Sequence, residues 1–364
     1  MHKISRLTPG SLRFASTWVV WLRVLVCVVA SGSATFGGEA KPANGMHSAL
    51  ASALQANGAA ALDALRPLDP SHLTSNDARV RGCMIERLER HASQQPTVEA
   101  PELVTLLGIY QEYWLRSLLK EHSASDNDAW LLESLNHMIK ARGGSAATTL
   151  DDLEKPLESM VEDHGYHSLF GLTRPLREFM LWRTQTTSKY DVDLPEGRQT
   201  VEVVFMDNFA SLGWAGFATC DRVHTGGWTK PDRLYAVRSS YDLDSENFHV
   251  SYLAHEGQHF SDQKRFPTLT RQVDLEYRAK LTEVALAKKS LYDLLDSFAG
   301  NMTDDDTVPH SFANRQVVSS LCDQLRVECA PLPNWHRFSR RRINDVATAL
   351  LHEDTRKRAL HHVS

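Results

Sequence analysis

Tyr252-Leu253-Ala254-His255-Glu256-Gly257-Gln258-His259-Phe260 guides the interpretation of the whole chain. Residues four apart on a helix share a face, so His255 and His259 would present two imidazoles side by side. Two such imidazoles can hold one metal ion, and Glu256 would project beside it, where a carboxylate can take a proton from a bound water. The H-E-x-x-H spacing therefore predicts a metal site, provided that the segment is helical and a third ligand is near.

The residues around the motif favour a helix. Side-chain oxygens that can form its N-cap precede it, at Asp242, Asp244 and Ser245. Glu246 places a negative charge in the first turn, where the helix dipole stabilises it. The apolar residues follow helical spacing, at Phe248, Tyr252, Leu253 and Phe260. Pro267 would end any helix that continues beyond the motif.

A second predicted helix, Leu269–Phe298, carries two candidates for a third ligand. Glu276 lies seventeen positions after His259, and Glu283 lies two turns further along the same helix face. The intervening residues are enough for a turn and a helix that packs back antiparallel on the first one. Two histidines and one glutamate, with a fourth position open for water, form the ligand set of a catalytic zinc site. The residues alone leave open which glutamate is the ligand.

The run His255-Glu-Gly-Gln-His259 followed by Glu276-Tyr-Arg-Ala279 resembles the gluzincin group of zinc metallopeptidases. In that group the third ligand is a Glu on a downstream helix, commonly followed three residues later by a small residue. Residues 251–285 also resemble a little-characterised set of secreted bacterial proteins that carry HEGQH, whereas the rest of the chain resembles them weakly. The resemblance implies one Zn²⁺ held by His255, His259 and Glu276, with Glu256 as general base. It leaves Glu283 as a support for these ligands or as a partner of Lys280.

A hydrolytic site of this kind also needs a donor for the oxyanion and groups that orient its ligands. His310, which follows the predicted ligand helix, is the first candidate for the donor. The alternatives are Tyr252, Tyr277, His224 and Arg271. Asp262, three residues after His259, is the candidate to accept the free ring N–H of that histidine. The other interpretation of Asp262 is a solvated residue near the end of its helix.

The N-terminus has the pattern of a secretory signal peptide over residues 1–34. Lys3, Arg6 and Arg13 precede the apolar run Trp18–Ala30, and the small residues of Ser31–Ala34 follow it. The run is too short for a stable anchor, and no other stretch is long and apolar enough to span a membrane. We expect a secreted or periplasmic protein without a stable membrane span. A lipid anchor on Cys27 is the alternative.

Charge and cysteine content narrow the class of protein. Loss of residues 1–34 removes four cations and no acids, which changes the formal net charge from −5 to about −9 and argues against nucleic acid as a partner. Cys322 and Cys329 could form a disulfide in an oxidising compartment. A continuous helix between them would hold their Cα atoms about 10 Å apart, too far for that bond. Free thiols are the alternative for these cysteines and for Cys83 and Cys220.

The remaining sequence predicts an α+β chain that is mostly helical. Residues 35–45 have the composition of a linker, and residues 46–195 are predicted to form a helical domain. Its expected helices are His47–Leu65, Asp77–His91, Glu102–His122, Asn127–Arg142, Leu150–Glu162 and Pro175–Arg183. Predicted strands follow at Thr200–Met206, Leu212–Cys220 and Leu234–Val237. We expect residues 196–364 to form a zincin-like metallopeptidase domain with a small sheet and two metal-binding helices.

Together with these patterns, the resemblance to gluzincins implies an exported, zinc-dependent metallopeptidase of that type, which acts on peptide or protein substrates. An edge strand of the small sheet would bind the substrate by adding it as a further strand. The alternative is a non-catalytic, metal-stabilised envelope or binding protein.

Overall fold

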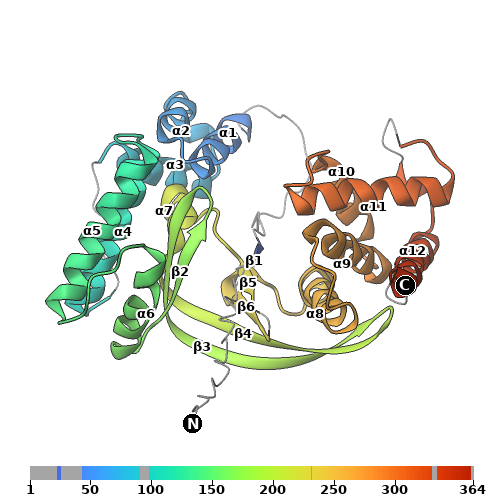
Figure 1. Cartoon of the computed structure of the whole chain (residues 1–364). Coiled ribbons are helices and arrows are strands. Elements are labelled where there is room, and N and C mark those ends of the chain that lie inside the picture. The colour runs from blue at the N-terminus through green and yellow to red at the C-terminus, as the bar shows by residue number, and fades with distance from the viewer. Residues whose placement is uncertain (1–22, 26–42, 91–97, 231, 330–333, 362–364) are drawn as a thin grey trace, which may run out of the picture.

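The computed structural model describes residues 23–25, 43–90, 98–230, 232–329 and 334–361. It shows a mixed α and β fold that is mostly helical, which confirms the predicted class. Figure 1 shows the helices of the N-terminal half on the left, those of the C-terminal half on the right, and a long curved hairpin beneath both. This hairpin lies on both sides of the domain boundary predicted at residue 195.

The N-terminal half contains the helices α1 (Ala43–Leu54), α2 (Gly58–Leu65), α3 (Ser75–Leu88), α4 (Pro101–Leu118), α5 (Ala124–Ala141) and α6 (Glu154–Asp163). The predicted helix His47–Leu65 is divided into α1 and α2, because the side chain of Asn57 accepts the N–H of Ala60 and starts a new helix. The apolar stripe of α4 is buried along its whole length. These helices form the largest apolar core among the described residues, together with β2 (His167–Thr173), part of β3 (Leu176–Leu194) and the short helix α7 (Gly213–Thr219).

The sheet has the strand order β1-β5-β6-β4-β3-β2. Its strands are β1 (Arg23–Leu25), β2 (His167–Thr173), β3 (Leu176–Leu194), β4 (Gly197–Leu212), β5 (Gly227–Thr229) and β6 (Leu234–Val237). All neighbours are antiparallel except β4 and β6, which are parallel. Because β3 and β4 are long, one end of their hairpin packs on the N-terminal helices and the other end packs beneath the C-terminal ones. The β6 bounds match the predicted strand Leu234–Val237.

The predicted helix Pro175–Arg183 is wrong, since these residues belong mainly to β3. Phe179 and Leu181 face the helical core, whereas Met180 and Trp182 face an apolar cluster on the other side of the sheet. A strand that is buried on both faces has a continuous apolar sequence without alternation, so its period does not distinguish it from a helix.

The predicted strand Leu212–Cys220 is also wrong, because most of it forms α7 (Gly213–Thr219). Gly213 follows β4 and begins α7 with a φ of 82°, a conformation that favours glycine. The backbone N–H of Trp214 then donates to the buried carboxylate of Glu178 at 3.0 Å. That carboxylate comes from β3 and satisfies an N–H in the first turn of α7, so the helix depends on a contact that is distant in sequence.

The C-terminal half begins with a π-helix, η4 (Phe248–Ala254), which continues into α8 (His255–Arg265). It then contains α9 (Gln272–Leu286), α10 (Leu291–Gly300), α11 (Pro309–Leu325) and α12 (Arg340–His361). Short 3₁₀ turns lie at Pro70–His72, Asp151–Leu153, Arg238–Ser240 and Trp335–Arg337. The helices η4 and α8 pack on the β3–β4 hairpin, and α9 to α12 share a separate apolar core.

The predicted helix Leu269–Phe298 is in fact two helices, α9 and α10. The carboxylate of Glu246 accepts the backbone N–H groups of Lys288, Lys289 and Ser290 at 2.7–3.0 Å and so caps the start of α10. Burial acts to raise the pKa of Glu246, but the hydrogen bonds from Ser290 and these N–H groups outweigh burial and lower that pKa to about 2. Glu246 therefore caps α10, whereas the sequence had suggested a role in the helix of its own motif.

The described cysteines form two disulfides, Cys83–Cys220 and Cys322–Cys329. The second one is compatible with its short loop because α11 ends at Leu325 and Arg326 adopts a left-handed conformation, with φ 58°. The chain reverses there and brings the two Cα atoms to 5.8 Å. The alternative of free thiols is therefore wrong for all four cysteines.

The N-terminal predictions fall mostly outside the described residues. Within 1–34 the structure describes only β1, and Cys27 is not described. Of the predicted linker 35–45, only its last residues are described, at the start of α1. No helix in the described part of the chain combines the length and apolar character that a membrane span requires.

Candidate metal centre

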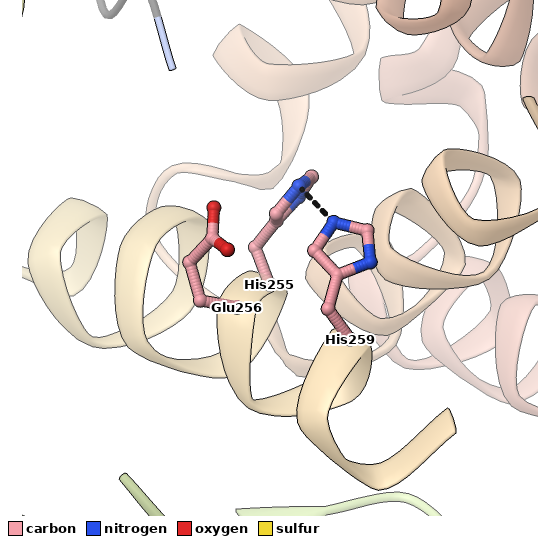
Figure 2. Close-up of side chains that lie close together, drawn as sticks. All are labelled: His255, Glu256 and His259. Atoms are coloured by element: carbon pink, nitrogen blue, oxygen red, sulfur yellow. Dashed lines mark hydrogen bonds between the residues drawn. The ribbon is translucent and has the colours of Figure 1, made fainter. Parts of the chain in front are cut away.

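The motif residues lie at the start of α8, directly after the π-helix η4. The N–H of Phe248 donates to Oγ of Ser245 at 3.1 Å, so one of the predicted N-cap residues does cap this helical segment. Short π-helical segments are rare and occur often at functional sites. Figure 2 shows the side chains of His255, Glu256 and His259 rising from one side of the helix.

Three side chains from two helices converge on a common point. Nε2 of His255 lies 3.2 Å from Nε2 of His259. The carboxylate of Glu276, on α9, lies 3.3 Å from the first nitrogen and 3.4 Å from the second. A tetrahedral zinc ion holds its ligands at about 2.0–2.2 Å, which places neighbouring ligand atoms roughly 3.3–3.6 Å apart. The separation of the two Nε2 atoms is close to this spacing, as is the distance from each of them to its nearer Glu276 oxygen, Oε2 for His255 and Oε1 for His259.

The convergent groups are almost completely buried, with exposed fractions of 2% for His255, 1% for His259 and 4% for Glu276. Oε2 of Glu276 makes no hydrogen bond of good angular geometry among the described residues. Nδ1 of His310 lies 2.8 Å from this oxygen, and a cation at the common point would give the buried carboxylate a further partner. The donor set therefore fits a small divalent ion.

Burial and the neighbouring charges also shift the pKa values of these groups. Burial acts to lower the pKa of His255, but the carboxylates of Glu283 and Glu276 outweigh burial and raise that pKa to about 10. Burial acts to raise the pKa of Glu276, yet His259, His255 and His310 hold it well below its usual range. The buried carboxylates thus create a site that favours positive charge, supplied by protons or by a metal ion.

Glu283 occupies the other side of His255. Its Oε1 lies 2.7 Å from Nδ1 of His255, and Nζ of Lys280 lies 3.7 Å from the same oxygen. An imidazole that donates through Nδ1 keeps the lone pair of Nε2 free for a metal. Of the two acids that the sequence left open, Glu276 faces the Nε2 atoms and Glu283 orients the ring.

Glu256 is buried beside the two imidazoles and belongs with them to a group whose ligand atoms lie within 4.8 Å of one another. Its Oε2 accepts a hydrogen bond of 2.7 Å from the hydroxyl of Thr229, on β5. Sequence analysis could not identify Thr229 as a partner of Glu256, because the two residues lie 27 positions apart on different elements.

Of the predicted oxyanion donors, His310, on the first turn of α11, contacts the cluster formed by His255, His259 and Glu276. Its Nδ1 lies 2.8 Å from Oε2 of Glu276, and its side chain is 43% exposed. The candidates Tyr252 and Tyr277 donate their hydroxyls to the carbonyl of Tyr235 and to Ser320. His224 contacts the carbonyl of Thr225, and Arg271 pairs with Asp274.

The predicted support of His259 by Asp262 is wrong. Asp262 accepts hydrogen bonds of 2.9 Å from Gln258 and from Arg278. The reason is that Gln258, four residues earlier on the same helix, and the buried Arg278 of α9 each bind one of the two carboxylate oxygens of Asp262. Nδ1 of His259 is buried without a hydrogen-bond partner among the described residues. Asp262 is fully buried, which also excludes the alternative of a solvated residue.

Arg278 is a second residue that sequence analysis missed. Its side chain is fully buried and binds Asp262 of α8, Glu196 of the β3–β4 turn, and Asp354 and Thr355 of α12. Gln258 adds a link between the helices, since its amide oxygen accepts from the hydroxyl of Thr282 on α9. These buried bonds fix α8 and α9 relative to each other, and with them the two sides of the cluster.

Comparison with known proteins gave no match to any protein-family model, curated protein or solved structure.

Proposed function

We propose that the protein is an exported, zinc-dependent metallopeptidase of the gluzincin type, with a zincin-like catalytic domain. The observation that carries this proposal is the convergence of His255, His259 and Glu276 at separations of 3.2–3.4 Å. Two imidazoles and one carboxylate leave a fourth position of a tetrahedral ion for water, as in catalytic zinc sites.

When bound, zinc supplies Lewis-acid polarisation of a substrate carbonyl and lowers the pKa of a coordinated water to near neutrality. Glu256 would act as general base, taking the proton from the attacking water and passing it to the leaving amine. Its carboxylate lies beside the two histidines and has one oxygen bonded to Thr229, so the other oxygen is free to accept that proton.

His310 would stabilise the negative charge that develops on the carbonyl oxygen. It lies at the cluster and is half-exposed, so a bound substrate can reach it, whereas His255 and His259 are buried. A preorganised donor at this position contributes to rate because it interacts more strongly with the transition state than with the substrate.

The substrate would be a peptide bound in an extended conformation along β5. This strand contacts the cluster through Thr229, and its antiparallel neighbour on the outer side is β1. Since β1 lies within the predicted signal peptide, its removal on export would open that edge for another strand. Added strands bind mainly through main-chain hydrogen bonds, which require little sequence preference.

Two disulfides support the exported location. Disulfides persist in oxidising compartments and are rare in cytosolic proteins. Cys83–Cys220 joins α3 to the end of α7, and Cys322–Cys329 closes the loop after α11. Together with the N-terminal pattern, they favour a secreted or periplasmic protein.

Two observations favour the alternative of a non-catalytic, metal-stabilised binding protein. The proposed ligands are nearly inaccessible, and His310 belongs with His255 and Glu276 to a second group of possible metal ligands. If His310 supplied a fourth ligand, the ion would have the closed coordination of structural zinc sites.

Measurement of zinc content and peptide cleavage separates the two functions. The mature chain and its Glu256→Gln variant are loaded with zinc and incubated with a mixed peptide library. The proposal expects about one zinc per chain in both proteins and cleavage only by the parent. Zinc in both with cleavage by neither supports the binding protein, and absence of zinc at neutral pH contradicts both functions.

A further inference from the structure

The hydroxyl of Thr229 donates a hydrogen bond to the carboxylate of Glu256. The donor and acceptor atoms are 2.7 Å apart, and both residues are buried. Glu256 belongs to α8, whereas Thr229 ends β5, so the bond joins the motif helix to the sheet.

Thr229 is itself held in place. It pairs with Leu234 of β6, and the next N–H, of Lys230, donates to the carbonyl of Arg233 at 2.9 Å. A β-branched side chain in a strand has few χ1 rotamers, so the hydroxyl direction is set by the backbone. A hydroxyl has one hydrogen to donate, and here that hydrogen is directed to Oε2 of Glu256.

From this geometry we infer that Thr229 is a positioning residue for Glu256. The inference rests on the proposed function and deepens it. Thr229 holds Oε2, which leaves Oε1 of Glu256 as the oxygen that would accept the proton of the attacking water. The same residue forms part of the strand along which the extended peptide would lie, so the base and the scissile carbonyl are aligned by one element. Small errors in such alignment cost large factors in rate.

A purely structural role for Thr229 makes a different prediction. In that case the hydroxyl only satisfies a buried carboxylate, and its loss would lower the stability of the fold without a specific effect on turnover. The two roles can therefore be separated by comparing kcat, KM, zinc content and thermal stability in the same variants.

The experiment compares zinc-loaded Thr229→Val, Thr229→Ser and Thr225→Val with the parent, using a peptide that the parent cleaves. Thr225 is a buried threonine on the same segment and serves as the matched control. We expect Thr229→Val to retain its zinc and its KM and to lose kcat by about 10- to 100-fold, as for loss of one bond to a charged group. Thr229→Ser should recover most of this loss, and Thr225→Val should retain the parent kcat.

A crystal structure of each zinc-loaded variant gives a readout that does not depend on activity. We expect the Glu256 carboxylate to leave its parent rotamer in Thr229→Val and to keep it in Thr229→Ser. An unchanged rotamer and kcat in Thr229→Val overturn the inference, as does an equal loss in Thr229→Ser. If the parent cleaves no peptide while the rotamer still depends on the hydroxyl, the positioning role stands and the proposed peptidase function fails.

Discussion

Oε1 of Glu283 lies 2.7 Å from Nδ1 of His255, on the opposite side of the imidazole from Glu276. One histidine is thus bounded by two buried acids that have different consequences for metal binding. Glu276 faces the nitrogen that would ligate the ion, and Glu283 fixes the tautomer that makes this nitrogen available.

Glu283→Gln is therefore expected to weaken zinc binding by about 10- to 100-fold, the usual cost of losing a group that orients a ligand. Glu276→Ala should lose zinc more completely, because it removes a direct ligand. Affinity is measured by competition with a chromophoric chelator, with the exposed Glu162→Gln variant as control. A larger loss in Glu283→Gln than in Glu276→Ala would show that the assignment of the two acids is reversed.

The local part of this site could be predicted from sequence, because helical spacing alone places His255, Glu256 and His259 together. Glu276 could be named as a candidate ligand, because the intervening residues are enough for a turn and an antiparallel helix that return it to the motif. Thr229 and Arg278 could not be predicted, since their partners lie on separate elements. Polar residues that bond across the fold produce no periodic pattern.

The errors in the predicted fold have related causes. Continuous apolar sequence does not separate a helix from a strand that is buried on both faces, as in β3. The break between α9 and α10 depends on Glu246, which lies more than forty residues away from the N–H groups that it caps. These two misassignments arise from tertiary contacts, whereas the division of the predicted helix His47–Leu65 arises locally, from the N-cap Asn57.

Arg278 is expected to contribute strongly to stability. Its guanidinium pairs with Asp262, which is also fully buried, so Arg278→Met would leave a buried carboxylate without its cation. Removing one partner of a buried pair typically costs about 3–5 kcal/mol. The free energy of unfolding is measured in urea with a chelator present, so that metal binding does not contribute.

Arg341→Met is the control for Arg278→Met, because Arg341 is 92% exposed and its contact with Asp345 is 3.9 Å long. We expect this control to change stability by less than about 0.5 kcal/mol. Equal effects of the two variants would show that the buried network around Arg278 does not stabilise the fold.

Glu178 is expected to make stability depend on pH. Burial raises the pKa of its carboxyl to about 7, although N–H groups of Trp214 and Phe179 bond to it. The folded-state pKa is above the ordinary value of 4.5, so the stabilising contribution is complete below pH 4.5 and is lost as pH rises through 7. The loss over this window is about 3 kcal/mol.

Glu178→Gln removes the titration and keeps an acceptor for both N–H groups. Stability of the variant should therefore fall less than that of the parent between pH 4.5 and pH 7, as measured by urea unfolding at several pH values. Parallel stability curves for parent and variant over this range would contradict a raised pKa for Glu178.

A variant of His310 distinguishes the proposed catalytic function from the proposed binding function. If it stabilises the oxyanion, His310→Ala should keep its zinc and lose kcat by about 100- to 1,000-fold, the usual effect of removing one such donor. Its Nδ1 would then donate to Glu276, and its Nε2 would contact the substrate without ligating the ion. Zinc affinity and kcat are measured on the same preparation, with His336→Ala, another exposed histidine, as control. A loss of zinc from His310→Ala as complete as that from Glu276→Ala would identify His310 as a fourth ligand, because loss of a group that only orients a ligand weakens binding by about 10- to 100-fold. The closed site would then favour the binding protein over the peptidase.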